Sequence, residues 1–138
     1  RFHNRLMFPL FDAQGNAVGF SGRHYDPRHP KNSSMTPAKY VNTPETLLYS
    51  KSRVLYGLYT AKTAIREKQR AVLVEGQFDL ILSHQAGVDE AVATSGTALT
   101  PDHVRLLKRY TAQVYTAFDS DSAGDAAGYR RGQSHNAS

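Results

Sequence analysis

The sequence contains no cysteine and no tryptophan among its 138 residues. Without cysteine there is no disulfide bond and no thiolate metal ligand, which is consistent with a cytosolic protein. No apolar run approaches the roughly 20 residues that a membrane-spanning helix needs. No signal peptide is visible, and because the chain starts at Arg1 rather than at methionine, we expect it to be a piece of a longer protein.

Acidic residues are scarce in the first half of the chain. Residues 1–70 hold twelve Lys and Arg against four Asp and Glu, whereas residues 71–138 hold five against eight. A basic half of this kind suggests a polyanion as partner, and a solvated basic surface explains the imbalance equally well. The length predicts one domain, or one domain joined to part of another.

The first half predicts a small mixed arrangement of strands and helix. Residues 5–25 predict a hairpin with its turn near residues 14–16, and residues 38–43 predict another short strand. Thr43 followed by Pro44 predicts the start of a helix. A helix is also predicted over residues 51–69, from the helical spacing of Val54, Leu55, Leu58, Tyr59, Ala61 and Ile65.

The second half alternates short apolar runs with helical patterns. Strands are predicted at residues 71–74, 91–94 and 113–118, and helices at residues 78–87, 101–110 and 123–131. This alternation predicts a parallel sheet flanked by helices, with strands that are buried and therefore continuously apolar. A strand order of 2-1-3 places the first strand of this unit beside the third.

Four carboxylates follow the strands of this predicted sheet. Glu75 lies just after the first strand and Asp79 in the first turn of the next helix, while Asp119 and Asp121 follow the third strand. In open parallel sheets, sites form beyond the carboxyl ends of the strands, so we expect these groups to converge. Clustered carboxylates repel one another, and a divalent cation removes that penalty. Hard oxygen ligands favour Mg²⁺ or Mn²⁺ over Zn²⁺.

The D-x-D pattern also has other interpretations. Asp119 alone is compatible with a helix N-cap, a role that Asp121 or Ser122 would share. A calcium-binding EF-hand loop is excluded because Ala123 and Arg130 occupy positions that require ligands. A phosphatase of the D-x-D-x-T type requires threonine where Ser122 stands.

The neighbouring residues are more specific. The segments "VEGQFD", "SGTALTPDHVRLL" and "FDSDSAGDAA" resemble the Toprim domain of topoisomerases, primases and related nucleases. The segments "RFHNRLMFP", "GFSGR" and "KYVNTPETLLYSKSRVLYGL" are similar to the region that precedes Toprim in bacterial DnaG-type primases. The resemblance covers residues 1–131. It implies an α/β fold, in which a small mixed α+β basic subdomain at residues 1–69 precedes a Toprim-like parallel sheet at residues 70–138.

The chain also departs from the family pattern. Gln77 and Phe78 stand where primases often carry tyrosine and methionine, and Ser21 stands where glycine is common. The resemblance further implies that a complete primase core continues beyond this chain, so we expect the Toprim part to be shortened at its C-terminal end. The zinc-binding and helicase-binding domains of a primase are not in this segment, and no zinc is expected here.

The implied activity is that of a DNA-directed RNA polymerase of the primase type. Such an enzyme is a nucleotidyltransferase that makes short RNA primers on single-stranded DNA from ribonucleoside triphosphates. By resemblance, Asp119 and Asp121 hold Mg²⁺ or Mn²⁺, Asp79 binds it directly or through water, and Glu75 is a ligand or a proton-transfer group. The implied setting is the cytoplasm, in the nucleoid at the replication fork, with the replicative helicase as a partner through a region absent here and no membrane.

The resemblance also assigns cations to phosphates and template. They are Arg5, Arg23, Lys39 and Lys51, together with Asn42 beside Lys39. Because neighbours in a strand point to opposite faces, we expect Lys39 to face a groove and Tyr40 the core.

Two further expectations concern side chains outside the chemistry. We expect Tyr56 and Tyr59 to pack in the core rather than to stack on bases, and His103 to be structural. Two alternatives to primase activity remain open. In the first, the chain is part of another Toprim enzyme, such as a topoisomerase or nuclease. In the second, it is a nucleic-acid-binding fragment without activity of its own.

Overall fold

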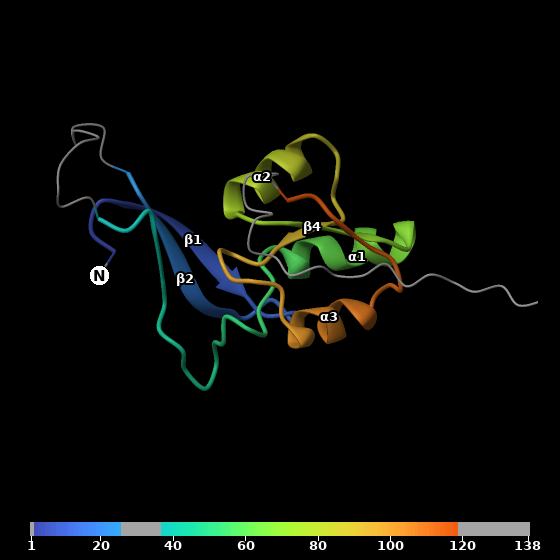
Figure 1. The fold of residues 1–138 in the computed structure, drawn as a ribbon, viewed down its shortest axis with the longest axis horizontal. Helices are drawn as coiled ribbons and strands as arrows, with labels where there is room; N and C mark the ends of the chain where they lie inside the picture. Colours follow the sequence, from blue (N-terminus) through green and yellow to red (C-terminus); the bar gives the residue numbers. More distant parts are fainter. Residues whose placement is uncertain (1, 26–36, 119–138) are drawn as a thin grey trace, which may run out of the picture.

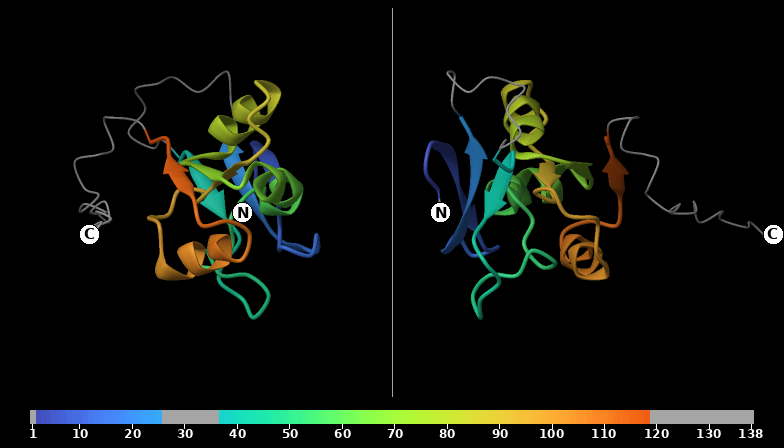
Figure 2. Two further views of the ribbon diagram at one scale, coloured as in Figure 1. Left: turned by 90° about the vertical axis from the view of Figure 1, so that its right-hand side faces the viewer. Right: turned by 60° about the vertical axis from the view of Figure 1, so that its left-hand side comes forward.

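The computed structural model describes residues 2–25 and 37–118, which form two small sheets and three helices (Figure 1). The strands at the N-terminal end lie to one side of the molecule, and the helices gather around the second sheet (Figures 1 and 2). No helix in these two ranges combines the length and apolar character needed to cross a membrane.

The first sheet is antiparallel, with the strand order β1-β2-β3. It consists of β1 (Arg5–Phe11), β2 (Ala17–His24) and β3 (Tyr40–Asn42). Asp12 holds the hairpin turn, because its carboxylate accepts hydrogen bonds from the Asn16 side chain and from the backbone N–H groups of Gln14 and Asn16. These bonds, the Asn16 side chain first, lower the pKa of Asp12. The predicted hairpin and third strand are therefore confirmed.

The second sheet is parallel, with the strand order β5-β4-β6. Its strands are β4 (Ala71–Val74), β5 (Ala91–Ala93) and β6 (Val114–Thr116). The first strand of this unit lies in the centre and pairs with both of the others. The predicted parallel sheet and its order are confirmed, and the carboxyl ends of all three strands share one edge.

Helices cover both faces of this parallel sheet. They are α1 (Leu58–Lys68), α2 (Gln77–Gln85) and α3 (Pro101–Lys108). Ala71 and Leu73 of β4 share a buried cluster with α1 and α3, whereas Val74 packs with Leu80 of α2. Because side chains alternate along β4, the strand contributes to two separate hydrophobic clusters, one on each face of the sheet. Although α1 lies before the predicted domain boundary at residue 70, it packs against the sheet that follows it.

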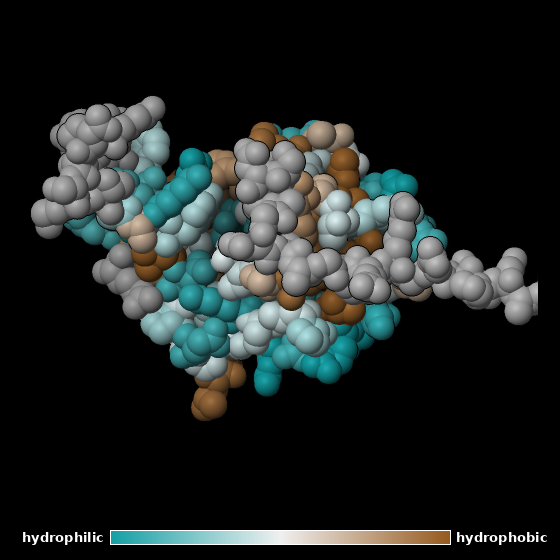
Figure 3. Space-filling model, viewed as in Figure 1, coloured by the Kyte–Doolittle hydropathy of each residue, from teal (hydrophilic) through white to brown (hydrophobic). Residues whose placement is uncertain are grey.

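The predicted helix starts at residues 44 and 51 are wrong. Side chains hold the loop after β3: the Thr46 hydroxyl accepts the N–H groups of Leu48 and Tyr49, and the Glu45 carboxylate accepts that of Lys51. Such side-chain bonds compete with the helical hydrogen bonds. The helix begins only after Gly57, whose φ of +84° breaks the pattern. The tip of this loop is apolar, because Leu47 and Leu48 are exposed. An apolar projection is visible at the bottom of Figure 3.

Two further predictions about burial are wrong. The β6 strand is exposed rather than buried, since its one partner among the described residues is β4 and its own side chains are open to solvent. Tyr59 is 46% exposed instead of being in the core. Its ring lies against the hairpin turn at Gly15, beneath the Lys62 ammonium group. Tyr56 is packed against the core as predicted, next to Val74 and Leu80.

Candidate functional site

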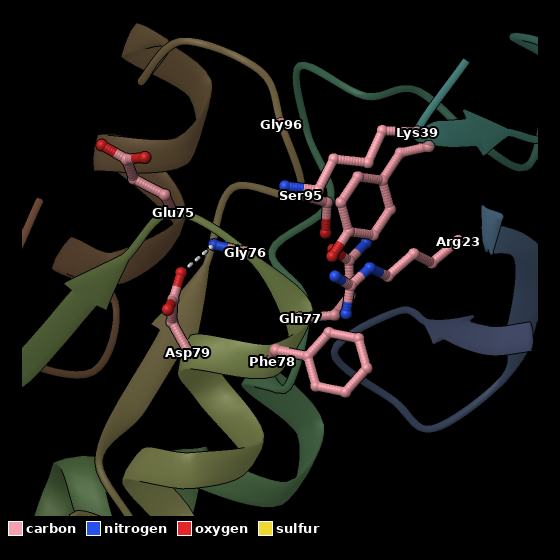
Figure 4. A pocket seen from close by; sticks show the side chains of 10 residues that line it. Arg23, Lys39, Glu75, Gly76, Gln77, Phe78, Asp79, Ser95 and Gly96 are labelled. Carbon is pink, nitrogen blue, oxygen red and sulfur yellow. Dashed lines mark hydrogen bonds between the residues drawn. The ribbon is translucent and has the colours of Figure 1, made fainter. Parts of the chain in front are cut away.

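A cavity of about 340 Å³ opens at the carboxyl ends of β4 and β5, between the parallel sheet and the end of β2 (Figure 4). Four segments line it: Arg23 of β2, Lys39 and Tyr40 where β3 begins, residues 75–79 from the end of β4 into the first turn of α2, and Ser95 with Gly96 after β5. The loop ends of one sheet and the strand end of the other therefore build a single pocket.

Carboxylates occupy one side of this pocket. Glu75 follows β4 directly, and Asp79 lies in the first turn of α2, near the positive end of the helix dipole. The Asp79 carboxylate accepts a hydrogen bond of 3.2 Å from the Gly76 N–H, which fixes its position at the start of the helix. Figure 4 shows both carboxylates on the side away from Arg23 and Lys39.

Cations occupy the opposite side. The Arg23 guanidinium lies 4.5 Å from the ring centre of Phe78 and 6.0 Å from that of Tyr40. No residue within 2–25 or 37–118 accepts a hydrogen bond from this guanidinium, although two carboxylates line the same pocket. Lys39 is exposed at the rim. The pocket therefore has a basic end and an acidic end, a polarity that suits a ligand with both negative charge and bound cations.

Tyr40 lies between these two ends rather than in the core, so the prediction for it is wrong. Burial raises the pKa of Tyr40, and the nearby Asp79 raises it further while Arg23 lowers it. Lys39 lies in a bend before β3, so the alternation of a strand does not separate it from Tyr40. Both side chains line the pocket.

The turn after β5 forms the remaining wall. Ser95 and Gly96 have φ values of +59° and +79°, and a left-handed serine is uncommon. The Ser95 hydroxyl is buried and has no hydrogen-bond partner among the described residues. The Gly96 N–H donates to the Glu75 carbonyl at 3.4 Å, which ties this turn to β4. A nearby hydroxyl, that of Thr97, closes the turn by donating to the Thr94 carbonyl at 2.9 Å.

Other predicted binding residues lie outside the walls of the pocket. Arg5 donates to the carbonyls of Gly22 and Ala38 at 3.1 and 2.9 Å, and so clamps the segment that carries Lys39. Asn42 pairs with Ser21 in the first sheet. Lys51 lies in the loop before α1. The structure thus brings together Arg23, Lys39, Glu75 and Asp79, but not Arg5, Asn42 and Lys51.

His103 has the structural role that was predicted. It is fully buried, and its ring accepts the Thr100 N–H and makes a 2.9 Å hydrogen bond to the Lys51 carbonyl. Burial lowers the pKa of His103, which hydrogen bonds to the backbone of Lys51 and Val54 partly oppose. The residue links the start of α3 to the loop that carries Lys51.

Asp119 and Asp121 lie outside the described residues. Within the residues that are described, no three His, Asp or Glu side chains form a group that could hold a metal ion. The two carboxylates that line the pocket, Glu75 and Asp79, are hard oxygen donors of the kind that Mg²⁺ and Mn²⁺ prefer. The Ala117 N–H donates to the Leu73 carbonyl at 2.8 Å, so the chain leaves β6 beside the end of β4.

Sequence reasoning missed several residues of the pocket. They are Tyr40 as a lining residue, Phe78, Ser95 and Gly96. The Ser-Gly pair after a predicted strand was an available signal, because such pairs mark turns with positive φ. Phe78 gave no signal of its own, since the side chain that it contacts lies 55 positions away in the sequence.

Comparisons with known families place the two halves of the chain separately. A family model for the N-terminal domain of the DNA primase catalytic core matches residues 1–62. A Toprim-like family model matches residues 72–135. Residues 63–71, which include the second half of α1, lie between the two matches.

The chain is similar to DNA primases from several bacteria. It is 46% identical to the Synechococcus elongatus protein over 132 residues, which are 94% of this chain and 18% of that protein. It is 41% identical to the Helicobacter pylori protein over 130 residues, or 94% of this chain and 22% of that protein. The chain therefore spans about a fifth of the length of the curated relatives that it matches.

Solved structures show the same similarity. The RNA polymerase domain of the Mycobacterium tuberculosis primase DnaG matches with a TM-score of 0.79 at 41% identity, covering 90% of this chain and 41% of that one. A DnaG primase catalytic domain bound to single-stranded DNA matches with a TM-score of 0.74 at 43% identity, covering 90% of this chain and 37% of that one.

Proposed function

We propose that this chain, which belongs to the family of DnaG-type DNA primases, forms part of the active site with which its parent protein makes RNA primers. The reaction joins ribonucleotides on a single-stranded DNA template, as in a DNA-directed RNA polymerase. The 3′-oxygen of the growing strand attacks the α-phosphorus of a ribonucleoside triphosphate, the bond to the bridging oxygen breaks, and pyrophosphate leaves.

The observation that supports this proposal is the polarity of the pocket. Arg23 and Lys39 face it from the first sheet, and Glu75 and Asp79 face it from the parallel sheet. Phosphoryl transfer depends mainly on positioning and on neutralisation of charge, and cations and metal-binding carboxylates supply both. A cavity of about 340 Å³ is within the range of small-ligand sites.

The carboxylates Glu75, Asp79, Asp119 and Asp121 together are proposed to hold Mg²⁺ or Mn²⁺. The position of β6 next to β4 supports the addition of the last two, which follow β6 in the sequence. When bound, the metal would neutralise negative charge on the phosphates. The Gly76 N–H orients Asp79 for this task, and Glu75 is either a further ligand or the group that accepts the proton of the attacking hydroxyl.

The cations are proposed to divide between two ligands. Arg23 binds phosphates of the triphosphate in the pocket, and Lys39, exposed at its rim, binds a phosphate of the template. Lys51, together with the neutral side chain of Asn42, lies outside the pocket walls and is also assigned to the template. Arg5 acts on the pocket through the backbone that it clamps, in addition to any phosphate contact. The proposed partners are single-stranded DNA, ribonucleoside triphosphates and the RNA primer, at the replication fork in the cytoplasm. The replicative helicase would be contacted through a part of the parent protein outside this chain.

Primer synthesis by the parent protein tests the proposal. With single-stranded DNA, ribonucleotides and Mg²⁺, the wild type should give short RNA products, and Asp119→Asn should abolish them while leaving template binding nearly intact. The Asp89→Asn variant is the matched control, because Asp89 is an exposed carboxylate outside the pocket. Cleavage or relaxation of DNA would indicate another Toprim enzyme, and binding without products would indicate a binding module.

The metal site is tested separately with Mn²⁺, whose paramagnetism broadens nearby NMR resonances. In this chain, resonances near Glu75 should broaden in the wild type and much less in Asp119→Asn/Asp121→Asn. Equal broadening in both proteins would exclude the proposed set of ligands.

A further inference from the structure

The guanidinium of Arg23 has an unusual environment for a cation in this protein. Its carbon atom lies 4.5 Å from the centre of the Phe78 ring, and the Tyr40 ring lies at 6.0 Å. Tyr40 belongs to β3 of the first sheet and Phe78 to α2, which packs on the parallel sheet. The guanidinium is therefore close to one aromatic residue from each half of the chain. Figure 4 shows the Arg23 side chain directed toward Phe78 at the basic end of the pocket.

Three other arginines are bound to oxygen atoms. Arg70 pairs with Glu90 and Arg105 with Asp102, while Arg5 donates to backbone carbonyls. Arg23 donates to no oxygen within residues 2–25 and 37–118, although it shares a pocket with Asp79. Among these described residues its N–H donors are not taken up, and the guanidinium lies near the two aromatic rings.

The Phe78 ring is itself held by the interior. It meets the Phe8 ring edge to face, with ring centres 5.5 Å apart and an angle of 81° between the planes. Phe8 is only 5% exposed, and it makes a second edge contact with Tyr56 at 6.2 Å. A connected row of rings thus runs from the core to the guanidinium. Edge-to-face pairs of this kind hold rings at fixed relative orientations.

This arrangement has a consequence for anion binding. An aromatic face attracts a guanidinium, while the N–H groups at the edge of the guanidinium stay free to meet a phosphate. Loss of the Phe78 ring would remove this contact, and the long Arg23 side chain could then turn toward the carboxylates across the pocket. Such an internal ion pair would compete with the ligand.

We propose that Phe78 is a positioning residue: its ring holds the Arg23 guanidinium at the basic end of the pocket, with donors free for the phosphates of the nucleoside triphosphate. This inference rests on the proposed function, because it takes that triphosphate as the ligand. Phe78 acts through Arg23 and need not touch the ligand itself.

The test compares Phe78→Leu and Phe78→Tyr in the parent protein. Loss of the ring should raise the KM for ribonucleoside triphosphate by about 3–10-fold, which corresponds to the usual strength of a partly desolvated cation–π contact. The kcat should stay within about twofold, and Phe78→Tyr should restore the wild-type KM. Phe78→Met, which conserves volume without a ring, serves if the leucine variant fails to fold.

A matched control is available elsewhere in the chain. The Arg66 guanidinium lies 4.8 Å from the centre of the Tyr110 ring, on α1 and after α3, outside the pocket. Tyr110→Leu removes a contact of the same kind, and it should leave the KM unchanged. An equal rise in KM in this control would mean that loss of a ring acts through general destabilisation.

Combination with Arg23→Ala separates positioning from packing. If Phe78 acts through Arg23, Phe78→Leu should add no further rise in KM once Arg23 is alanine. Independent, multiplying effects would overturn the inference, as would a wild-type KM in both Phe78→Leu and Phe78→Met. Failure of the proposed function looks different, since the wild type would then make no primer and Arg23→Ala would not change triphosphate binding.

Discussion

Ser21 of β2 and Gln77 of α2 form a buried hydrogen bond, in which the Gln77 amide nitrogen lies 2.9 Å from the Ser21 hydroxyl oxygen. Ser21 is fully buried in β2, and Gln77, the first residue of α2, is 2% exposed. The bond lies next to the pocket, because residues 76–79 line it and Arg23 is two positions from Ser21. It therefore joins the element that carries the cation to the helix that carries Asp79.

Removal of this bond should destabilise the chain. In Ser21→Ala the buried Gln77 amide loses its partner, so we expect the free energy of unfolding to fall by about 1–3 kcal/mol. Urea denaturation followed by circular dichroism measures it. In Ser21→Ala/Gln77→Met both polar groups are gone, and the loss should be smaller than the sum of the two single changes. Strict additivity would show that the two side chains do not interact.

Lys39→Ala should weaken the binding of single-stranded DNA by the parent protein. If Lys39 neutralises one phosphate, the slope of log K against log salt should flatten by about 0.7. Lys108→Ala is the matched control, since Lys108 is exposed on α3 away from the pocket, and it should change neither affinity nor slope. Unchanged affinity and slope in Lys39→Ala would show that this position is merely a solvated surface.

Glu90 should make stability depend on acid pH. Its side chain is 1% exposed and lies 2.7 Å from the Lys68 ammonium group and 2.9 Å from the Arg70 guanidinium. Burial alone would raise the pKa of Glu90, but hydrogen bonds from these cations and the backbone outweigh it and lower the pKa from 4.5 to about 2. The stability due to the ionised group is therefore present above pH 4.5 and is lost as the pH falls toward 2.

The Glu90→Gln variant checks this sign. At pH 7 it should unfold more readily than the wild type by about 1–3 kcal/mol, because charge-assisted hydrogen bonds are lost. The difference in the free energy of unfolding should shrink between pH 4.5 and pH 2.5, as measured by urea denaturation. Asp89→Asn, a change at the exposed neighbouring carboxylate, should show little difference at any pH. A constant difference across the range for Glu90→Gln would contradict the expectation.

Gly57 and Gly87 provide a matched pair of glycines. Both have positive φ, +84° and +89°, but a Cβ at Gly57 would lie 2.5 Å from a methyl carbon of Leu80, whereas one at Gly87 would meet nothing within 4 Å. We expect Gly87→Ala to cost about 1 kcal/mol of backbone strain. Gly57→Ala should cost about 2–4 kcal/mol, because crowding of the buried Leu80 is added. Similar thermal unfolding of the two variants would show that crowding contributes nothing.

The sequence was sufficient for features that depend on neighbouring residues. The hairpin followed from its turn, and the order of the parallel sheet followed from apolar runs and the carboxylates after them. The start of α1 was missed because Thr46 and Glu45 bind the backbone of their own loop in a way that no periodicity reveals. The prediction that Lys39 and Tyr40 point to opposite faces of a strand was wrong, because β3 begins at Tyr40 and Lys39 lies before it.

Contacts across the two halves were also out of reach. Ser21, Gln77 and Phe78 were recognised only as departures from a family pattern, without a role. The structure pairs Ser21 with Gln77 and places Phe78 on Arg23. A neutral side chain carries no sign of the partner that it will meet, so these relations required coordinates.

The strand connections imply an order of folding. β1 and β2 are separated by the five residues 12–16, whereas β4 and β6 are separated by the 39 residues 75–113, which include two crossover connections. Closing a longer loop costs more entropy, and folding slows as the mean sequence separation of contacts rises. We therefore expect the hairpin that carries Arg23 to form early and the edge that carries Glu75 to form late. The basic side of the pocket is then formed before the acidic side, and the cavity is complete only when the parallel sheet has assembled.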